Sequence, residues 1–327
     1  MKALVTGAAG FIGSHLAEAL LDGGAQVTGI DCFADYYPRP IKERNLAAVR
    51  ERPGFAFVES TIQAADLRAL LTGVTHVFHL AAQAGVRKSW GRDFQVYTAN
   101  NIEATQVLLE ACAAAALERL VYASSSSVYG DDVALPMRED ALPRPVSPYG
   151  VSKLAAEQLC YLYHVNHGVP AVSLRYFTVY GPRQRPDMGF HRFLCAAMRG
   201  EPIEVFGDGE QTRDFTFVSD AVAATMAAGT KGVPGRVYNI GGGSRVSVNQ
   251  VLGIVARVTG LPVRTRPSEK QKGDMRDTFA DTALARADLG FAPGVTLADG
   301  LAAQFNWLRT APESRGPSRG EPGRGGR

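Results

Sequence analysis

The sequence predicts an α/β fold, with a doubly wound parallel sheet and a smaller C-terminal substrate lobe. Short apolar runs alternate with helical stretches through the first half of the chain, and this rhythm stops after about residue 178. The 327-residue chain is 46% hydrophobic, which is enough for a large core. We therefore expect helices on both faces of one sheet, followed by loops and shorter elements.

Six runs rich in apolar and β-branched residues are the candidate strands. They lie at residues 3–5, 26–30, 55–58, 76–79, 119–122 and 171–175. Helical stretches are expected at residues 11–21, 94–114 and 151–167. Strands that alternate with helices pair in parallel, so their carboxyl ends meet at one edge of the sheet, where ligands bind.

The chain divides into two parts in this interpretation. Residues 1–177 form the sheet domain, and segments near 214–243 return to it. Residues 178–310 mainly form the substrate lobe, because prolines and glycines there separate shorter elements. The tail at 311–327 is rich in Gly, Pro, Ser and Arg and cannot bury a core, so we expect it to be disordered.

Three glycines after the first strand predict a dinucleotide site. Gly7, Gly10 and Gly13 allow a tight turn, close approach of the backbone to a pyrophosphate, and close packing of helix on strand. The free N–H groups at the start of the helix then face the phosphates. Asp31 follows the second strand and can bind the ribose 2′-hydroxyl of NAD, while it would repel the 2′-phosphate of NADP. We therefore expect a Rossmann domain that binds NAD.

Charge and cysteine content argue against several classes of protein. The net charge of +3 is too small to imply nucleic acid or a membrane as the main partner. The four cysteines show no C-x-x-C spacing, so we expect neither a metal site nor disulfides, but reduced thiols in a cytoplasm. No apolar run approaches about 18 residues, and the first strand starts too early for a signal peptide.

Tyr149 and Lys153 are the candidate catalytic pair. They stand four residues apart in the first turns of a predicted helix, so both side chains lie on one face. An ordinary tyrosine, with a pKa of about 10, is a poor base at neutral pH. A neighbouring ammonium favours the phenolate and lowers the pKa of the phenol, so this spacing predicts a tyrosine base assisted by a lysine.

A run of four serines follows the fifth predicted strand, at the edge of the sheet where ligands bind. Their hydroxyls can bond a substrate hydroxyl and share its proton with Tyr149. Ser125, Ser126 and Ser127 are the candidates, and the sequence does not choose between them. His79 ends the fourth strand, where we expect it to be hydrogen-bonded rather than catalytic.

These motifs together resemble the extended short-chain dehydrogenase/reductase family, within it the NAD-dependent nucleotide-sugar epimerases and dehydratases. The likeness covers residues 1 to about 310 and rests on the glycine triplet, the serine before Val128-Tyr129-Gly130, and Tyr149-x-x-x-Lys153. Segments at 35–37, 81–87 and 177–188 are most similar to UDP-glucuronate 4-epimerases. The resemblance implies a cytoplasmic, homodimeric 4-epimerase that oxidises a UDP-sugar transiently at C4, with UDP-glucuronate and UDP-galacturonate as the expected pair.

The resemblance also implies which residues bind the ligands. Those expected to hold NAD are Gly7, Gly10, Phe11, Ile12, Gly13, Asp31, Thr61, Ile62, Leu80, Ala81, Ala82, Asn101, Tyr149, Lys153 and Tyr176. Those expected to hold the UDP-sugar are Arg87, Ser127, Thr178, Arg185, Val205, Arg213, Asp274 and Arg276. In the second set, Arg87 and Arg213 are expected at the diphosphate, because guanidinium groups pair well with phosphate oxygens.

Arg185 is the candidate for the C6 carboxylate of a uronic acid. The transient 4-keto sugar is a β-keto acid that can lose carbon dioxide, so an epimerase must hold this carboxylate away from the geometry for that loss. A planar guanidinium matches a carboxylate with two parallel hydrogen bonds. A solvent-facing arginine and a phosphate contact are the alternatives for this residue.

Other functions stay open at this point. A UDP-glucose 4-epimerase or a UDP-glucuronate decarboxylase could use the same scaffold. A non-catalytic NAD-sensing protein is less well supported, because such proteins commonly lack the tyrosine or the lysine. A 4,6-dehydratase is disfavoured, because Ser126 and Ser127 stand where those enzymes usually have Asp-Glu.

Overall fold

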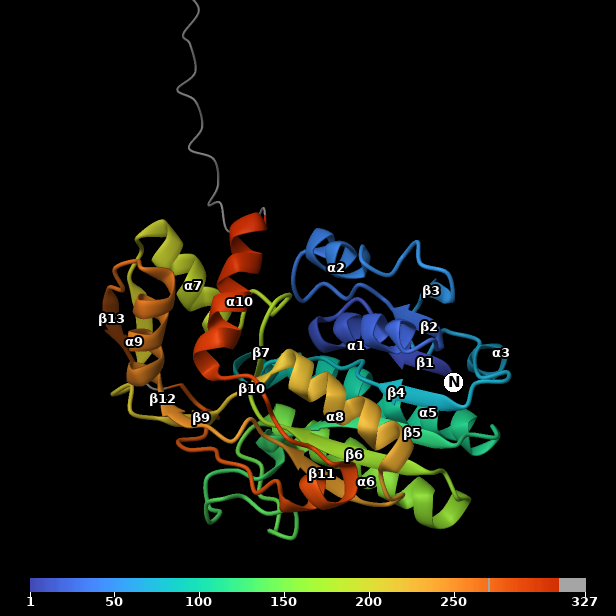
Figure 1. Ribbon diagram of the computed structural model, residues 1–327. Helices are drawn as coiled ribbons and strands as arrows, with labels where there is room; N and C mark the ends of the chain where they lie inside the picture. The colour runs from blue at the N-terminus through green and yellow to red at the C-terminus, as the bar shows by residue number, and fades with distance from the viewer. Residues whose placement is uncertain (270, 312–327) are drawn as a thin grey trace, which may run out of the picture.

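The structure, a computed structural model, describes residues 1–269 and 271–311 of the chain. A seven-stranded sheet forms its centre, in the order β11-β6-β5-β4-β1-β2-β3, and every pair of neighbours is parallel (Figure 1). Its strands are β1 (Lys2–Thr6), β2 (Gln26–Asp31), β3 (Phe55–Glu59), β4 (His76–His79), β5 (Arg119–Ser125), β6 (Ala171–Tyr176) and β11 (Val237–Ile240). The predicted doubly wound parallel sheet is confirmed.

All six predicted strands lie in this sheet, and only their ends differ. β5 runs three residues past its predicted end because it stays paired with β6 as far as Ser125. Ser124 and Ser125 therefore belong to the strand rather than to the turn after it. The seventh strand, β11, comes from late in the chain and pairs with β6 at one edge of the sheet.

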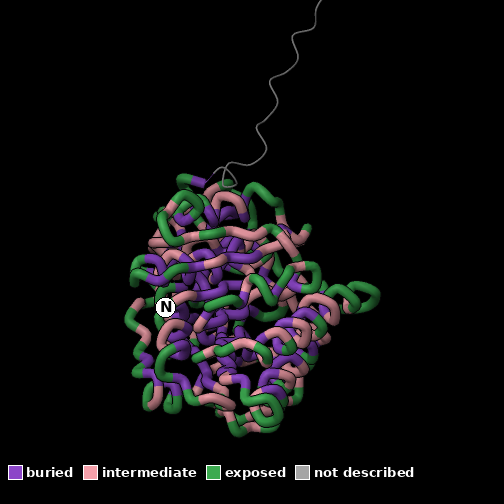
Figure 2. Tube along the Cα trace, turned by 90° about the vertical axis from the view of Figure 1, so that its right-hand side faces the viewer, coloured by how far each residue is buried: buried purple, intermediate pink, exposed green. Residues whose placement is uncertain are grey.

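Helices cover both faces of the sheet, because alternate residues of a buried strand point to opposite faces. In β1, Ala3 and Val5 join one core with α1 (Phe11–Asp22) and α8 (Val218–Lys231). Leu4 joins a second core with α5 (Ala104–Ala113) and α6 (Pro148–His167). Figure 2 shows the buried residues gathered inside and exposed residues along the outer loops.

A smaller lobe lies beside the sheet and encloses a core of its own (Figure 1). It contains α7 (Gly189–Arg199), α9 (Val248–Thr259) and α10 (Leu297–Thr310). Three strand pairs are β7 (Val179–Tyr180) with β10 (Thr216–Phe217), β8 (Ile203–Phe206) with β13 (Thr265–Ser268), and β9 (Thr212–Asp214) with β12 (Arg245–Ser247). Short connecting helices are α2 (Arg39–Leu46), α3 (Leu67–Leu70), α4 (Phe94–Tyr97), η1 (Arg87–Ser89), η2 (Gly91–Asp93), η3 (Thr98–Glu103), η4 (Ser126–Val128) and η5 (Ala285–Leu289).

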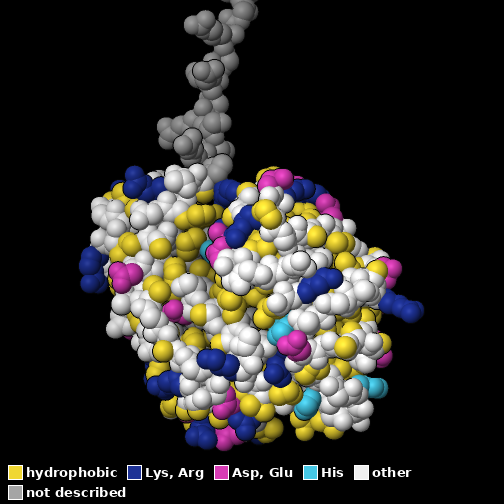
Figure 3. Space-filling model, turned by 45° about the vertical axis from the view of Figure 1, so that its right-hand side comes forward, with side chains coloured by type: hydrophobic (Ala, Val, Ile, Leu, Met, Phe, Trp, Pro, Cys, Tyr) yellow, Lys and Arg dark blue, Asp and Glu magenta, His cyan; other side chains and the backbone are white. Residues whose placement is uncertain are grey.

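Charged side chains of both signs are interspersed on the face shown in Figure 3. Within residues 1–269 and 271–311, no helix has the length and apolar character of a transmembrane segment. In the same ranges, no three His, Cys, Asp or Glu side chains are grouped so that they could bind a metal ion. The division into domains at the predicted limits stays a prediction, and the predicted tail lies, apart from Ala311, outside the described residues.

The single helix predicted over residues 94–114 is wrong in its middle. The chain forms α4, then the wider π-helical turns of η3, and only then α5. Thr105 donates a side-chain hydrogen bond to the carbonyl oxygen of Asn101 at 2.6 Å, and the Asn101 side chain bonds the backbone of Gln83. The wider turns are thus accompanied by a hydrogen bond within the helix and by contacts with Gln83, and the apolar periodicity of the sequence does not predict them.

α6 carries the predicted catalytic pair and starts one turn earlier than the predicted helix. Ser147 caps it, because its hydroxyl accepts a hydrogen bond from the Gly150 N–H at 3.1 Å. Pro148 follows in the first turn, where its fixed φ suits a helix. The helix ends at Gly168, which adopts a left-handed φ of +69°.

A buried ion pair joins α6 to the sheet beside the serine strand. Arg175 on β6 donates from Nη2 to Glu157 Oε1 at 2.6 Å and from Nε to Oε2 at 3.1 Å. Ser124 on β5 donates to the same carboxylate at 2.6 Å. The Arg175 and Glu157 side chains are only 3% and 2% exposed, so each buried charge depends on the other. The pair holds α6 against the end of β5.

Arg175→Met should lower the free energy of unfolding by about 3–5 kcal/mol, because it leaves the Glu157 carboxylate buried without its partner. Adding Glu157→Leu should recover most of this loss, since it removes the orphaned charge. Arg138→Met is the matched control: it breaks an exposed pair with Asp140 and should cost about 1 kcal/mol or less. Urea unfolding measures all of these variants, and equal losses for the two single arginine variants would contradict the assignment.

Candidate active site

The glycine triplet forms the turn between β1 and α1, as predicted. Gly7 adopts a φ of +72°, and a side chain at Gly13 would place its Cβ only 2.2 Å from the Gly7 carbonyl oxygen. A side chain is therefore strained at the first position and excluded at the second. α1 has neither a side-chain cap nor an acidic residue in its first turn, so no side chain of its own competes with an anion for the first N–H groups.

Asp31 ends β2 beside this turn. Its carboxylate accepts hydrogen bonds from the N–H groups of Ala9 at 3.1 Å and Phe33 at 2.8 Å. Burial raises the pKa of Asp31, while the charge of Lys42 and the two backbone bonds oppose that rise. The carboxylate is thus held as an acceptor on the wall of the cavity described next.

One cavity extends from the glycine turn to the first turns of α6. All but one of the residues expected to hold NAD line it: Gly7, Gly10, Phe11, Ile12, Gly13, Asp31, Thr61, Ile62, Leu80, Ala81, Ala82, Tyr149, Lys153 and Tyr176. These residues fit a dinucleotide chemically, because the turn lets backbone N–H groups approach a pyrophosphate and Asp31 can accept from a ribose hydroxyl.

Asn101 is the residue that differs from this expectation. It is buried, its Oδ1 accepts from the Gln83 N–H at 2.7 Å, and its Nδ2 donates to the Gln83 carbonyl oxygen and to Ser152. Asn100 lines the cavity in its place. The wider turn of η3 sets which asparagine faces the cavity, and periodicity alone does not predict such a turn.

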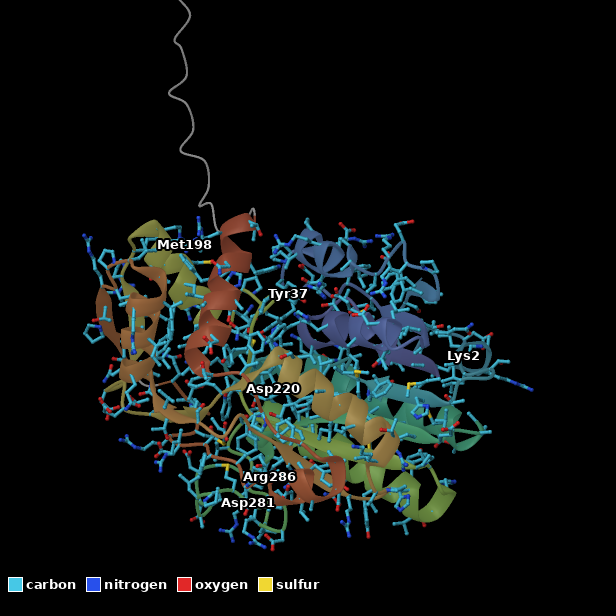
Figure 4. All side chains as sticks on the ribbon, in the orientation of Figure 1. Lys2, Tyr37, Met198, Asp220, Asp281 and Arg286 are labelled. Carbon is cyan, nitrogen blue, oxygen red and sulfur yellow. The ribbon has the colours of Figure 1, made fainter. Side chains whose placement is uncertain are left out.

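Several cavity residues were not among those predicted to bind a ligand. They include Cys32, Tyr36, Tyr37, Lys42, Gln83 and Asn100. Tyr36, Tyr37 and Gln83 belong to the segments that resemble UDP-glucuronate 4-epimerases, so that likeness could have pointed to them. Figure 4 labels Tyr37, which lies where the sheet half meets the smaller lobe.

Tyr149 and Lys153 both reach the cavity from α6. Lys153 Nζ donates to the carbonyl oxygen of Ala123 at 2.7 Å, and burial lowers the pKa of this ammonium to about 8. Burial raises the pKa of Tyr149, while a hydrogen bond with Ser125 and the charge of Arg185 oppose that rise. Among the described residues, the charge of Arg185 lowers this pKa. The Lys153 ammonium is bonded to the β5 backbone, and the help expected from it stays a prediction.

The serine turn brings Ser125 to Tyr149. Ser125 Oγ accepts a hydrogen bond from the Ser127 N–H at 3.1 Å as the chain leaves β5. A side chain on Gly150 would meet the Ser127 carbonyl oxygen at 2.4 Å, so the start of α6 packs directly on this turn. Of the three candidate serines, Ser125 is the one whose hydrogen bond lowers the pKa of Tyr149. Among the residues of the serine run, Ser124 lines the cavity, and Ser125, Ser126 and Ser127 do not.

His79 is hydrogen-bonded at the end of β4, as predicted. Its Nδ1 bonds Thr6 Oγ1 at 2.7 Å and its Nε2 bonds Thr105 Oγ1 at 2.9 Å. Burial lowers the pKa of His79 to about 3, and the charge of Lys153 lowers it further in the same direction. The imidazole is therefore neutral at physiological pH and holds β4 to β1 and α5.

Arg185 lines the same cavity as Tyr149, from the loop between β7 and α7. Its Nε and Nη2 donate to the two carboxylate oxygens of Asp187 at 3.0 and 3.1 Å. Tyr36 donates its hydroxyl to that carboxylate at 3.2 Å. The structure thus brings an arginine, a carboxylate and a tyrosine together near the predicted base.

Other residues expected at the substrate gather near β8 and β9. Arg87 Nη2 donates to Asp274 at 2.7 Å, and the Arg87 guanidinium carbon lies 4.1 Å from the centre of the Phe206 ring. Arg213 donates to the carbonyl oxygen of Arg276 at 2.9 Å. Burial lowers the pKa of Arg213, although nearby carboxylates such as Asp274 oppose this. Two guanidinium groups therefore stand close together around one carboxylate.

The remaining predicted substrate residues are held mainly by backbone contacts. The Arg276 N–H donates to Asp131 at 2.7 Å, and Val205 is buried in β8. The Thr178 carbonyl oxygen accepts from the Thr216 N–H at 3.0 Å, between β6 and β7. None of these three lines the cavity of Tyr149 in the part of the chain that the structure describes.

Comparisons with known proteins agree with this fold. The family model of the NAD dependent epimerase/dehydratase family matches residues 3–241. An uncharacterized UDP-glucose epimerase of Bacillus subtilis is 45% identical over 94% of this chain and 98% of its own, and a UDP-glucuronate 4-epimerase of Thermodesulfobacterium geofontis is 38% identical over 94% and 95%. The solved UDP-glucuronic acid 4-epimerase of Bacillus cereus, in complex with UDP-glucuronic acid and NAD, superposes with a TM-score of 0.92 at 45% identity, over 94% of this chain and 99% of its own. The chain belongs to the NAD dependent epimerase/dehydratase family.

Proposed function

We propose that the protein is an NAD-dependent 4-epimerase that interconverts UDP-glucuronate and UDP-galacturonate. One observation carries this proposal: a tyrosine and an arginine line one cavity together with a dinucleotide-binding turn. The tyrosine suits proton transfer at a sugar hydroxyl, and the arginine suits the carboxylate of a uronic acid. The relatives named as UDP-glucuronate 4-epimerases support the same substrate.

NAD is held, in this proposal, by the N–H groups at the start of α1, by Asp31 at the adenosine ribose and by Lys153 at the nicotinamide ribose. When bound, it supplies a transient oxidation at C4 of the sugar by accepting a hydride and returning it. The sugar therefore leaves with the same oxidation state, and its C4 configuration is inverted if the hydride returns to the opposite face.

Tyr149 accepts the proton of the C4 hydroxyl during the oxidation and returns it to the same oxygen when the ketone is reduced. A hydrogen bond from Ser125 lowers the pKa of Tyr149, and Ser125 can also hydrogen-bond the C4 oxygen. The proton passes between the C4 oxygen and the Tyr149 hydroxyl, with Ser125 bonded beside them, so no external acid or base is required. We assign Tyr149 as the base and Ser125 as its partner.

Arg185 binds the C6 carboxylate and keeps the β-keto acid from losing carbon dioxide. Arg87 and Arg213 bind the diphosphate, because two guanidinium groups near one another match two phosphates. The Nε and Nη2 groups of Arg87 donate hydrogen bonds to Asp274 in the structure, and a phosphate oxygen would share these donors. The sugar would then lie between this pair of arginines and the cavity of Tyr149.

A UDP-glucose 4-epimerase is the second candidate, on one specific observation. The relative MoeE5, 45% identical, has been solved with NAD and UDP-glucose and, at 44% identity, with NAD and UDP-glucuronic acid. A site of this kind thus accommodates both a neutral and an acidic sugar in that protein. A decarboxylase would arise on the same scaffold if the carboxylate were held less firmly.

The homodimer and the cytoplasmic location are further proposals. α6 leaves Val151, Tyr161, Leu162 and Val165 at least 45% exposed, and Val96 on α4 is equally exposed. Such residues suit an interface between two copies of the chain, because apolar surface gains most from being covered. The reduced cysteines expected from the sequence support the cytoplasm.

Tyr149→Phe should lower the rate of epimerisation by about 10²–10⁴-fold while NAD is retained, because a phenyl ring cannot accept the proton. Incubation with UDP-glucuronate and chromatography of the products measure the rate, and absorbance of the denatured protein measures bound NAD. Tyr161→Phe is the matched control, since Tyr161 lies exposed on the same helix. Near-normal turnover in Tyr149→Phe would remove this residue from its role.

Ser125→Ala should move the acidic limb of the pH–rate profile to higher pH. The hydrogen bond from Ser125 lowers the pKa of Tyr149, so its loss raises that pKa. Because only the ionised phenol accepts a proton, fewer molecules are active at pH 7, and the rate there should fall about tenfold or more. An acidic limb that stays in place would show that Ser125 does not act on Tyr149; Ser126→Ala is the neighbouring control.

Arg185→Ala should weaken binding of UDP-glucuronate by about 10–100-fold, because a charge-assisted bidentate contact is lost. It should also release a UDP-pentose together with carbon dioxide, since the 4-keto acid is no longer restrained. Arg192→Ala, an exposed arginine on α7, is the control. Unchanged affinity for the acid sugar with unchanged products would refute the assignment.

A further inference from the structure

Asp187 bonds only one edge of the Arg185 guanidinium. The edge formed by Nε and Nη2 donates to both oxygens of Asp187, at 3.0 and 3.1 Å. A guanidinium has a second edge, formed by Nη1 and Nη2, that can pair with another carboxylate. Within residues 1–269 and 271–311, Nη1 donates no hydrogen bond to the protein, and Arg185 lines the cavity of Tyr149.

Tyr36, which lines the same cavity, holds Asp187 in place. Its hydroxyl donates to Asp187 Oδ2 at 3.2 Å, and its ring centre lies 5.8 Å from the guanidinium carbon of Arg185. Lys88 covers the same ring at 4.9 Å. A side chain at Gly85 would lie 2.1 Å from the Tyr36 hydroxyl, so only glycine there lets this tyrosine reach its place. Residues 85–88 thus place Tyr36, and Tyr36 and Arg185, which are far apart in the sequence, meet at the Asp187 carboxylate.

The carboxylate of Asp187 is ionised at neutral pH. Burial by itself would raise its pKa, but the charge of Arg185 and the hydrogen bonds from Arg185 and Tyr36 together lower it below its usual range. The side chains of Arg185 and Asp187 are 21% and 31% exposed, so the pair is partly screened by solvent and is a weak source of stability. Such a pair contributes little to stability, but a binding site gains from its fixed geometry.

We propose, on the basis of the proposed function, that Asp187 and Tyr36 fix the plane of the Arg185 guanidinium so that its free edge receives the carboxylate of a uronic acid. Asp187 is then a positioning residue that sets the preference for acidic over neutral sugars. Its own contact with the substrate is not required. An arginine already held in place loses less conformational freedom on binding, so the acid sugar binds more tightly.

Asp187→Asn tests this proposal in the NAD-loaded protein. The variant keeps the size of the side chain and removes its charge. Calorimetric titration should give a dissociation constant for UDP-glucuronate about tenfold higher than that of the unchanged protein, because the arginine must now be ordered by the ligand. The dissociation constant for UDP-glucose should stay within about twofold, since this sugar has no carboxylate for Arg185.

Asp140→Asn is the matched control, because Asp140 pairs with Arg138 two residues away, as Asp187 pairs with Arg185, but on the exposed surface. Tyr36→Phe removes only the hydroxyl that holds Asp187 and should raise the same dissociation constant about threefold. It keeps the proposal testable if the Asp187 variant does not fold.

Two results would overturn the proposal. Equal weakening for both sugars would assign Asp187 to the stability of the loop, and tighter binding of UDP-glucuronate would mean that Asp187 competes with the substrate for Arg185. The proposed function fails separately: the unchanged protein would then neither bind UDP-glucuronate in preference to UDP nor epimerise it.

Discussion

The contact between the first turn of α6 and the serine turn after β5 fixes the geometry of the site. Gly150 allows it, because any side chain there would meet the Ser127 carbonyl oxygen at 2.4 Å. The contact sets Tyr149 beside Ser125 and, one turn later, directs Lys153 to the carbonyl oxygen of Ala123. The proposed acid–base pair therefore depends on how a helix start packs on a strand end. Further along the helix, the buried Glu157 carboxylate pairs with Arg175 on β6 and accepts a hydrogen bond from Ser124 on β5.

Much of this arrangement could be predicted from the sequence, because its parts are local. The glycine triplet, the acid after the second strand and the tyrosine–lysine spacing each depend on a few neighbouring residues, and the structure brings them to one cavity. The predictions for β5 and α6 were too short. Pairing with β6 decides where β5 ends, and the cap at Ser147 decides where α6 begins. A helix broken by the π-helical turns of η3 could not be predicted, since the contacts that accompany it come from Gln83 in another segment.

The cation that acts on Tyr149 shows the limit of local patterns most clearly. Spacing on a helix placed Lys153 near Tyr149, and both do share a face and a cavity. Spacing along a helix does not predict hydrogen-bond acceptors on other elements, and the Lys153 ammonium donates to the carbonyl oxygen of Ala123 on β5. Arg185 comes from a loop some 35 residues later, and Asp187 and Tyr36 decide how it is held. These relations exist only once three distant segments have folded together.

Arg185 has two electrostatic roles in the proposed function, and they oppose each other. Its charge lowers the pKa of Tyr149, which favours the phenolate, and its free edge is suited to a carboxylate. A uronic acid bound there would add a second negative charge beside the one on Asp187, so it would weaken the help that the arginine gives to the phenolate. Bound NAD would supply a positive charge at its nicotinamide ring that opposes this effect while the cofactor is oxidised. A neutral sugar does not impose the conflict, so an acidic substrate requires a guanidinium whose geometry is fixed before it binds.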